Sequence, residues 1–227
     1  MKKHYILMGS LFSVLIFCPQ VFALESSGEI TGRVSTLGAG VEFVKPINEN
    51  VTIGLGINGY TYSESMDESG VSYEADLELQ TLSLIANYHP WAGIFRVSGG
   101  VMYNGNNFSI TAEPAADGTY EFNGETYDAT DVGSVTGEID FNNMAPYIGI
   151  GLGKSPASTG WSLDVNVGLL YQGTPDASLT ATCGVLLQDA QCTQLQSDLA
   201  SEQTELQDEL DGFEWYPVVS LGVSYMF

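Results

Sequence analysis

The sequence predicts an all-β fold, an eight-stranded antiparallel transmembrane β-barrel of the outer-membrane type with long acidic extracellular loops. Three observations predict it: an export signal at the N-terminus, a period-two alternation of apolar and polar residues along most of the chain, and a C-terminal strand that ends in Phe227. The chain has 227 residues, of which 44% are hydrophobic, so it can bury enough apolar surface to fold despite a formal net charge of −22.

The N-terminus has the three parts of a secretory signal peptide. A basic start is followed by an apolar stretch from Tyr5 to Phe17 and by the small residue Ala23 at the expected cleavage position. We predict cleavage after Ala23, so that residues 1–23 are removed and residues 24–227 form the barrel. The apolar stretch is shorter than the ~20 residues that a membrane-spanning helix requires.

Alternation, turn residues and connection lengths predict eight strands. Short connections at Pro46–Asn50, Pro90–Gly93 and Gly153–Gly160 alternate with long ones, as periplasmic turns and extracellular loops do, and an even strand number places both ends in the periplasm. Pro146 and Pro217 lack a ladder N–H, so each is expected at a strand margin or a bulge. The expected strands are Gly28–Thr36, Ala39–Lys45, Val51–Tyr62, Glu78–His89, Ile94–Thr111, Val135–Leu152, Trp161–Gly173 and Trp215–Phe227.

Aromatic residues distinguish a membrane barrel from a soluble β-sandwich, which alternates in the same way. The apolar face of one segment begins at Trp161 and ends at Tyr171. Ten steps of ~3.3 Å, tilted by ~40°, span roughly 25 Å, the height of the lipid-facing band between the aromatic girdles of an outer-membrane barrel. The last strand carries Trp215, Tyr225 and the terminal Phe227 on one face. We assign these five residues to the girdles, and we expect the barrel assembly machinery to recognise Phe227.

Four stretches of the chain carry a family resemblance: Tyr88–Trp91, Ala145–Gly151, Gly173–Pro175 and Glu214–Val218. In these motifs, and in the order and spacing of its strands, the chain resembles the CarO family of small outer-membrane barrels. The resemblance implies an eight-stranded barrel, an association with carbapenem susceptibility, and uptake of basic amino acids such as ornithine.

The acidic residues are concentrated in three stretches. Most of the 28 aspartates and glutamates fall in residues 63–80, 111–142 and 173–214, which contain none of the 6 lysines and arginines. So few basic residues exclude a nucleic-acid-binding surface. The acidic stretches either keep surface loops solvated or form an electrostatic funnel that concentrates cations, including basic amino acids and the divalent ions between lipopolysaccharide phosphates.

Four charged residues are expected inside the barrel, in its periplasmic third. Arg33 and Glu42 are symmetric about the turn at Leu37–Gly38 and should face each other, while Arg96 and Asp164 lie at similar heights on non-adjacent strands. Side chains just fill the interior of an eight-stranded barrel, and buried charges must pair. The four residues therefore form either a network that plugs the lumen or a gate or solute site.

The long connections contain further recognisable elements. Thr119–Asp128 predicts a hairpin about an Asn-Gly turn, with Tyr120 opposite Tyr127. Cys183 and Cys192 pass through an oxidising periplasm and are expected to form a disulfide. The segment after them predicts an amphipathic helix that covers the barrel mouth or recognises a partner. Its apolar positions are Leu195, Leu199, Leu206 and Leu210.

No catalytic set is visible in the sequence. The mature chain has one histidine, His89, which lies beside a periplasmic turn with no nucleophile arrangement near it in the sequence. Asp128 and Asp131 lack the spacing of a twelve-residue calcium loop. We therefore predict no enzymatic activity, no metal site and no cofactor.

Two functions remain for such a barrel in the outer membrane of a Gram-negative cell. The first is a narrow or gated uptake channel for small cationic solutes such as basic amino acids. The second is a closed barrel that stabilises the envelope or acts as an adhesion or interaction scaffold through its extracellular loops. In either case the expected partners are outer-membrane lipid and lipopolysaccharide, and the expected state is a monomer.

Overall fold

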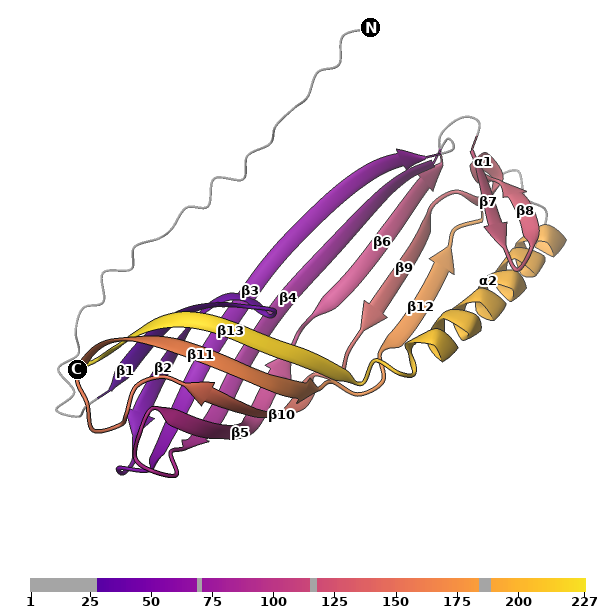
Figure 1. Ribbon diagram of the computed structural model, residues 1–227. Helices are drawn as coiled ribbons and strands as arrows, with labels where there is room; N and C mark the ends of the chain where they lie inside the picture. The colour runs from indigo at the N-terminus through magenta and orange to yellow at the C-terminus, as the bar shows by residue number, and fades with distance from the viewer. Residues whose placement is uncertain (1–27, 69–70, 115–117, 184–188) are drawn as a thin grey trace, which may run out of the picture.

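The computed structural model describes residues 28–68, 71–114, 118–183 and 189–227 (Figure 1). The predicted signal peptide and its cleavage position lie outside these residues. The described elements are β1 (Glu29–Ser35), β2 (Gly38–Pro46), β3 (Val51–Glu68), β4 (Val71–Tyr88), β5 (Phe95–Asn104), β6 (Asn107–Pro114), β7 (Thr119–Phe122), β8 (Glu125–Asp128), α1 (Ala129–Val132), β9 (Val135–Asp140), β10 (Met144–Leu152), β11 (Gly160–Tyr171), β12 (Asp176–Ala181), α2 (Asp189–Leu210) and β13 (Trp215–Met226).

Eight strands close into an antiparallel barrel, which confirms the predicted fold class. The order around the barrel is β1, β2, β3, β4, β5, β10, β11 and β13, and β13 pairs again with β1. Short turns join the strands at one end of the barrel, which we call the short-turn end. The other end, at the level of the β1–β2 turn, is the rim.

Five strands continue the barrel wall beyond the rim. Strand β4 pairs with β5 over Thr81–Tyr88 and with β6 over Val71–Glu78. Beyond β6 follow β9 and β12, so that the outer parts of β3 and β4 together with β6, β9 and β12 form one open sheet, the rim sheet (Figure 1). The predicted strands Ile94–Thr111 and Val135–Leu152 are therefore wrong as single strands, since each is two strands separated by a short break. Strand β12 lies where a loop was expected.

The break between β5 and β6 has a local hydrogen-bonding cause. The backbone N–H of Gly105 donates to the carbonyl of Gln80, and the Asn106 side chain accepts from the Gln80 N–H. The Asn106 side chain thus replaces a backbone acceptor of the strand ladder at Gln80, and β4 changes its partner there from β5 to β6.

The barrel strands alternate as the sequence predicts, with apolar side chains outside and polar ones inside. On β11, Leu163 and Val167 are exposed on the outer surface, whereas Asp164 and Asn166 are buried in the lumen. Aromatic rings gather at both ends of this outer surface. Trp161 contacts Tyr225 with ring centroids 5.0 Å apart at the short-turn end, near Phe227, and Tyr171 contacts Trp215 at 4.9 Å at the rim.

The two strand prolines lie where a neighbouring strand has ended. Pro146 pairs with β5, while the pairing of β10 with β11 begins only at Tyr147. Pro217 pairs with β11, while the pairing of β13 with β1 ends at Ser220. Both prolines therefore occupy strand margins, where a missing N–H leaves no ladder hydrogen bond unmade.

A hairpin and two helices pack against the rim sheet. The β7–β8 turn has positive φ at Asn123 (51°) and Gly124 (78°), and Tyr120 pairs with Tyr127, as the Asn-Gly sequence predicts. Neither described helix is long and apolar enough to cross a membrane. Leu195 and Leu199 of α2 are buried in a core with Val71, Ala112, Tyr120, Val132 and Val135.

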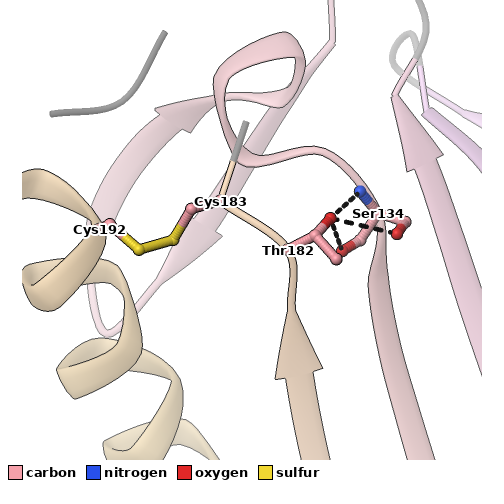
Figure 2. Close-up of a disulfide and its surroundings, with 4 residues drawn as sticks. All are labelled: Ser134, Thr182, Cys183 and Cys192. Atoms are coloured by element: carbon pink, nitrogen blue, oxygen red, sulfur yellow. Dashed lines mark hydrogen bonds between the residues drawn. A yellow bond between two sulfur atoms is a disulfide. The ribbon is translucent and has the colours of Figure 1, made fainter. Parts of the chain in front are cut away.

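Helix α2 also closes the outer edge of the rim sheet. The side chains of Gln203 and Gln207 accept hydrogen bonds from the β12 backbone N–H groups of Leu179 and Ala177, and Gln207 donates to the carbonyl of Pro175. Cys183 and Cys192 form a disulfide that joins the end of β12 to the first turn of α2 (Figure 2). The helix is thus held to the sheet edge by covalent and polar contacts.

The contact between α2 and the β7–β8 hairpin should stabilise their packing on the rim sheet only within a defined pH range. The Tyr127 hydroxyl donates to the buried Asp198 carboxylate, which raises the pKa of Tyr127 to about 12 and lowers the pKa of Asp198. An unfolded phenol ionises near ~10, so the contribution of Tyr127 is complete below that pH and is lost as pH rises towards about 12. That of Asp198 is complete above an unfolded pKa of ~4 and is lost as pH falls through the lowered folded value.

Tyr127→Phe should therefore reduce the tyrosinate absorbance change near pH 12 by the share of one phenol, and it should increase hydrogen exchange in α2 at neutral pH. Tyr60→Phe, which removes a phenol outside this contact, should leave hydrogen exchange in α2 unchanged. An absorbance change near pH 12 that is as large in Tyr127→Phe as in the wild type would contradict the assignment.

Candidate functional site in the lumen

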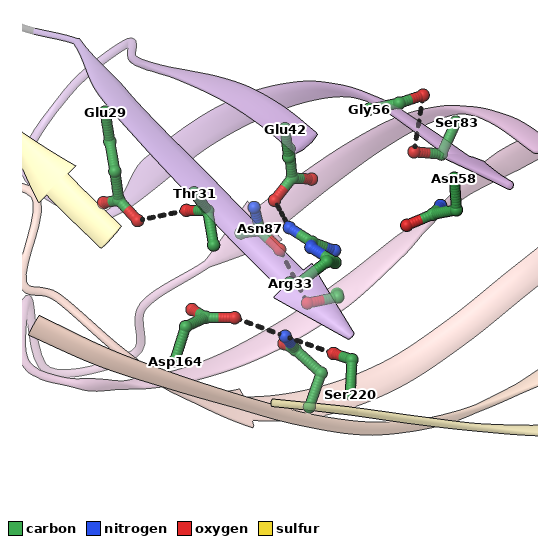
Figure 3. Close-up of polar contacts among 12 residues, drawn as sticks. Glu29, Thr31, Arg33, Glu42, Gly56, Asn58, Ser83, Asn87, Asp164 and Ser220 are labelled. Atoms are coloured by element: carbon green, nitrogen blue, oxygen red, sulfur yellow. Dashed lines mark hydrogen bonds and ion pairs between the residues drawn. The ribbon is translucent and has the colours of Figure 1, made fainter. Parts of the chain in front are cut away.

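Arg33 and Glu42 form the first ion pair in the lumen (Figure 3). They are not directly opposite each other, as the predicted symmetry required, because the turn is centred between Thr36 and Leu37. Arg33 pairs in register with Gly40, and Glu42 pairs with Thr31, so the two side chains meet diagonally. A Cβ at Gly54 would lie 2.5 Å from Glu42 Oε1, so the glycine makes room for the carboxylate.

Arg96 and Asp164 form the second ion pair, across the intervening strand β10. Arg96 Nη2 lies 2.6 Å from Asp164 Oδ2, and both residues are buried. Asn166 accepts from the same Arg96 nitrogen and donates to Asp164 and to Ser220. A Cβ at Gly153 of the neighbouring connection would lie 2.3 Å from Arg96 Nη1. The pair is therefore enclosed and hydrogen-bonded, as a buried ion pair must be.

Neutral polar side chains continue this network. Asn87 accepts from Ser98 and donates to Thr52, and Asn58 donates to Thr81 (Figure 3 shows Asn87 and Asn58). His89 lies at the short-turn end, where its Nδ1 is 2.9 Å from the carbonyl of Gly93. This contact is a structural one within the turn.

An apolar layer crosses the lumen on the rim side of the ion pairs. Leu37, from the β1–β2 turn, is 1% exposed and packs over the rim side of the lumen. Sequence reasoning missed this layer because its members are isolated apolar residues at inward positions of strands with otherwise polar inner faces. An apolar residue that falls at an inward position of the period-two alternation is the sequence signal that would have identified them. The layer consists of Leu37, Ile85, Met102, Ala145, Tyr147, Leu170 and Val218.

The space left inside the barrel is small. The cavity bounded by the apolar layer and the two arginines has a volume of about 30 Å³, enough for about two water molecules. The interior is therefore filled by side chains, as expected for eight strands.

The carboxylates of β4 beyond the rim face away from the axis of the barrel, whereas Glu64 of β3 shares the inner face with Tyr60 and Tyr62. Glu74, Asp76 and Glu78 share the outer face of β4 with the lipid-facing Leu82, whereas Leu77 and Leu79 point inwards. Asn107 donates to both Glu138 and Asp140 on the same outer face. In the described residues no group of three or more histidine, cysteine, aspartate or glutamate side chains is arranged to hold a metal ion. The acids of β4 thus lie on the outside of the wall and do not line a funnel.

The chain is similar to several solved structures. CarO2 of Acinetobacter baumannii is 27% identical, with 89% of this chain and 99% of that chain covered and a TM-score of 0.57. CarO of the same organism is 24% identical over 88% and 97%, with a TM-score of 0.55. A major outer membrane protein from Thermus thermophilus is 14% identical over 89% and 98%, with a TM-score of 0.44. No protein-family model and no curated protein sequence matches the chain.

A closed barrel with an apolar exterior, two aromatic belts and a polar interior defines an outer-membrane β-barrel protein. More particularly, the chain is a CarO-like outer-membrane barrel, which confirms the resemblance seen in its motifs.

The Arg96–Asp164 pair predicts a large effect of one substitution on stability. Arg96→Met leaves Asp164 buried without its cation, which should lower the free energy of unfolding by ~3–5 kcal/mol. The double variant Arg96→Met/Asp164→Leu removes both charges and should recover most of the loss. The free energies of unfolding of the single and the double variant can be measured by urea unfolding in phospholipid vesicles, followed by the gel mobility of the folded barrel. A single variant as stable as the wild type would contradict an enclosed ion pair.

Proposed function

We propose that this protein is a closed outer-membrane barrel that anchors a folded, acidic interaction scaffold at the cell surface. The observation that carries the proposal is the filled lumen. A hydrated solute would have to cross both the apolar layer under Leu37 and the ion-pair network, and the remaining cavity of about 30 Å³ does not hold an amino acid.

In this proposal the rim sheet, the two helices and the β7–β8 hairpin lie outside the cell. The short turns and both chain ends lie in the periplasm, as the even number of barrel strands predicts for a chain exported by the signal peptide of residues 1–23, and Phe227 serves the barrel assembly machinery. The aromatic belts sit at the two membrane interfaces, and the carboxylates of the rim sheet meet the lipopolysaccharide layer, where divalent cations bridge like charges. The closed barrel needs no second copy, so the functional unit is a monomer.

A gated uptake path for small cationic solutes is the second candidate. The ion pairs favour it, because Glu42 and Asp164 provide carboxylates inside the lumen at which an ammonium group could exchange with an arginine. For this function the Leu37 turn must move away from the lumen, since a charged group is strongly disfavoured in an apolar layer.

Liposome swelling separates the two candidates. Wild-type vesicles should not swell in ornithine, in arginine or in the anionic control glutamate, because the side chains leave no continuous path. Swelling in ornithine and arginine but not in glutamate would replace the scaffold by gated uptake. Leu37→Ala, which thins the apolar layer, should then increase the swelling rate.

The scaffold proposal also predicts electrostatic contact with cationic partners. Neutral phosphatidylcholine vesicles that carry the protein should be retained on a polylysine surface at low salt and released at high salt, because added ions screen exposed charges. Glu74→Gln/Asp76→Asn should reduce retention, whereas Glu49→Gln at the short-turn end should not. Retention that is insensitive to the double change would contradict a role for the rim-sheet carboxylates.

A further inference from the structure

An apolar cavity lies between the rim and the inner face of the rim sheet, on the far side of the Leu37 layer from the ion pairs. Its volume is about 680 Å³, within the ~300–1,000 Å³ of small-molecule sites. Aliphatic and aromatic side chains dominate the lining, among them Tyr60, Leu77, Leu79, Phe108, Phe141 and Tyr216. Helix α2 and the β7–β8 hairpin pack on a different part of the same sheet and leave this part uncovered.

One polar group of the lining has unmet hydrogen-bonding capacity. Gln172 is 4% exposed, and its Nε2 donates to the carbonyl of Phe213. Its Oε1 is buried and has no partner among the described residues. A buried acceptor without a donor is unfavourable, so a ligand that brings an O–H or N–H group gains a hydrogen bond that the free protein lacks when the Gln172 side chain turns this enclosed oxygen towards the cavity.

The cavity is connected to the lipid-facing surface at one side. Strand β2 ends its pairing with β3 at Ala39 and Gly59, so β3 has no neighbour on that side from Tyr60 onwards in the described part of the chain. Ala39, Tyr60 and Leu79 line both the cavity and a hollow on the outer wall, where Val41, Ile57 and Leu82 face the lipid. An apolar molecule in the membrane can therefore enter sideways at the rim.

The charges near the cavity select against an anionic ligand. The basic residues of the described chain are Arg33, Lys45, Arg96 and Lys154; none lies in the rim sheet, and none lines this cavity. Glu78 lines the adjoining hollow on the outer wall. A carboxylate or sulfate head would meet negative charge without a counter-ion, and an ammonium group would be desolvated at the floor beside Gln172. A neutral hydrogen-bond donor such as a hydroxyl group avoids both the repulsion and the desolvation.

We propose that this cavity binds a neutral amphiphile from the membrane, a single alkyl chain that ends in a hydroxyl group, with the chain against Leu77, Leu79 and Phe108 and the hydroxyl donating to Gln172 Oε1. The site is separate from the scaffold function, because it uses the inner face of the rim sheet whereas Glu74 and Asp76 of β4 lie on the outer face.

Photolabelling in phosphatidylcholine nanodiscs tests the proposal. The probe is a dodecanol that carries a diazirine in its chain, and mass spectrometry locates the labelled residues. Labelling should be concentrated on the cavity lining and should be competed by unlabelled dodecanol. The corresponding dodecanoic acid probe should label the lining at least several-fold less. Labelling that is not saturable, or an acid probe that labels the lining equally, would overturn the proposal.

Two variants and a matched control locate the site. Leu79→Trp places a larger side chain in the cavity and should reduce labelling of its lining, whereas Leu221→Trp on the lipid-facing surface should have no effect. Gln172→Leu removes the acceptor and should weaken dodecanol competition about fivefold, the expected loss for one neutral hydrogen bond, while leaving competition by dodecane unchanged. Gel mobility of the folded barrel verifies each variant. If Leu79→Trp does not fold, saturable wild-type labelling still decides the question, and equal competition by dodecanol and dodecane would remove the role of Gln172.

Discussion

The pairing of every barrel strand with two neighbours is the constraint on which the rest of the structure depends. A bilayer offers no water to backbone N–H and C=O groups, so a sheet in lipid must close on itself. With eight strands, closure leaves an interior that side chains just fill. The buried charges then have no solvent, and Arg33 and Arg96 must pair with Glu42 and Asp164 inside the lumen. A closed wall thus leads directly to a filled lumen.

Beyond the rim the same constraint no longer applies, and the sheet opens. Water or other protein groups can satisfy its edges, and the two edges differ. Glutamines of α2 accept from the N–H groups of β12, whereas β3 has no neighbouring strand beyond Gly59 on its side towards β2 in the described residues. The two faces of β4 also differ, since the alternation that separates lipid from lumen below the rim separates carboxylates from an apolar cavity above it. One strand pattern therefore serves two environments.

The predictions succeeded where the chemistry is local. Alternation located the barrel strands, the Asn-Gly pair located the β7–β8 turn, and leucine spacing located α2. They failed where a single side chain changes the pairing. Asn106 divides one predicted strand into β5 and β6, and a shift in the turn centre moves Glu42 from opposite Arg33 to opposite Thr31. Neither the strand break nor the shifted turn changes the hydrophobic periodicity, because apolar and polar residues still alternate before and after each of them.

The sequence by itself determined the barrel, its two faces and the positions of its aromatic belts, since each of these depends on whether a residue meets lipid, water or the interior. Only the tertiary structure decided which inward residues meet. Arg96 reaches Asp164 across β10, Leu37 folds over the lumen, and Gln172 comes to line a cavity with Tyr60 and Phe108. Those contacts depend on the stagger of strands around a closed ring, a property of the whole chain that no local pattern records.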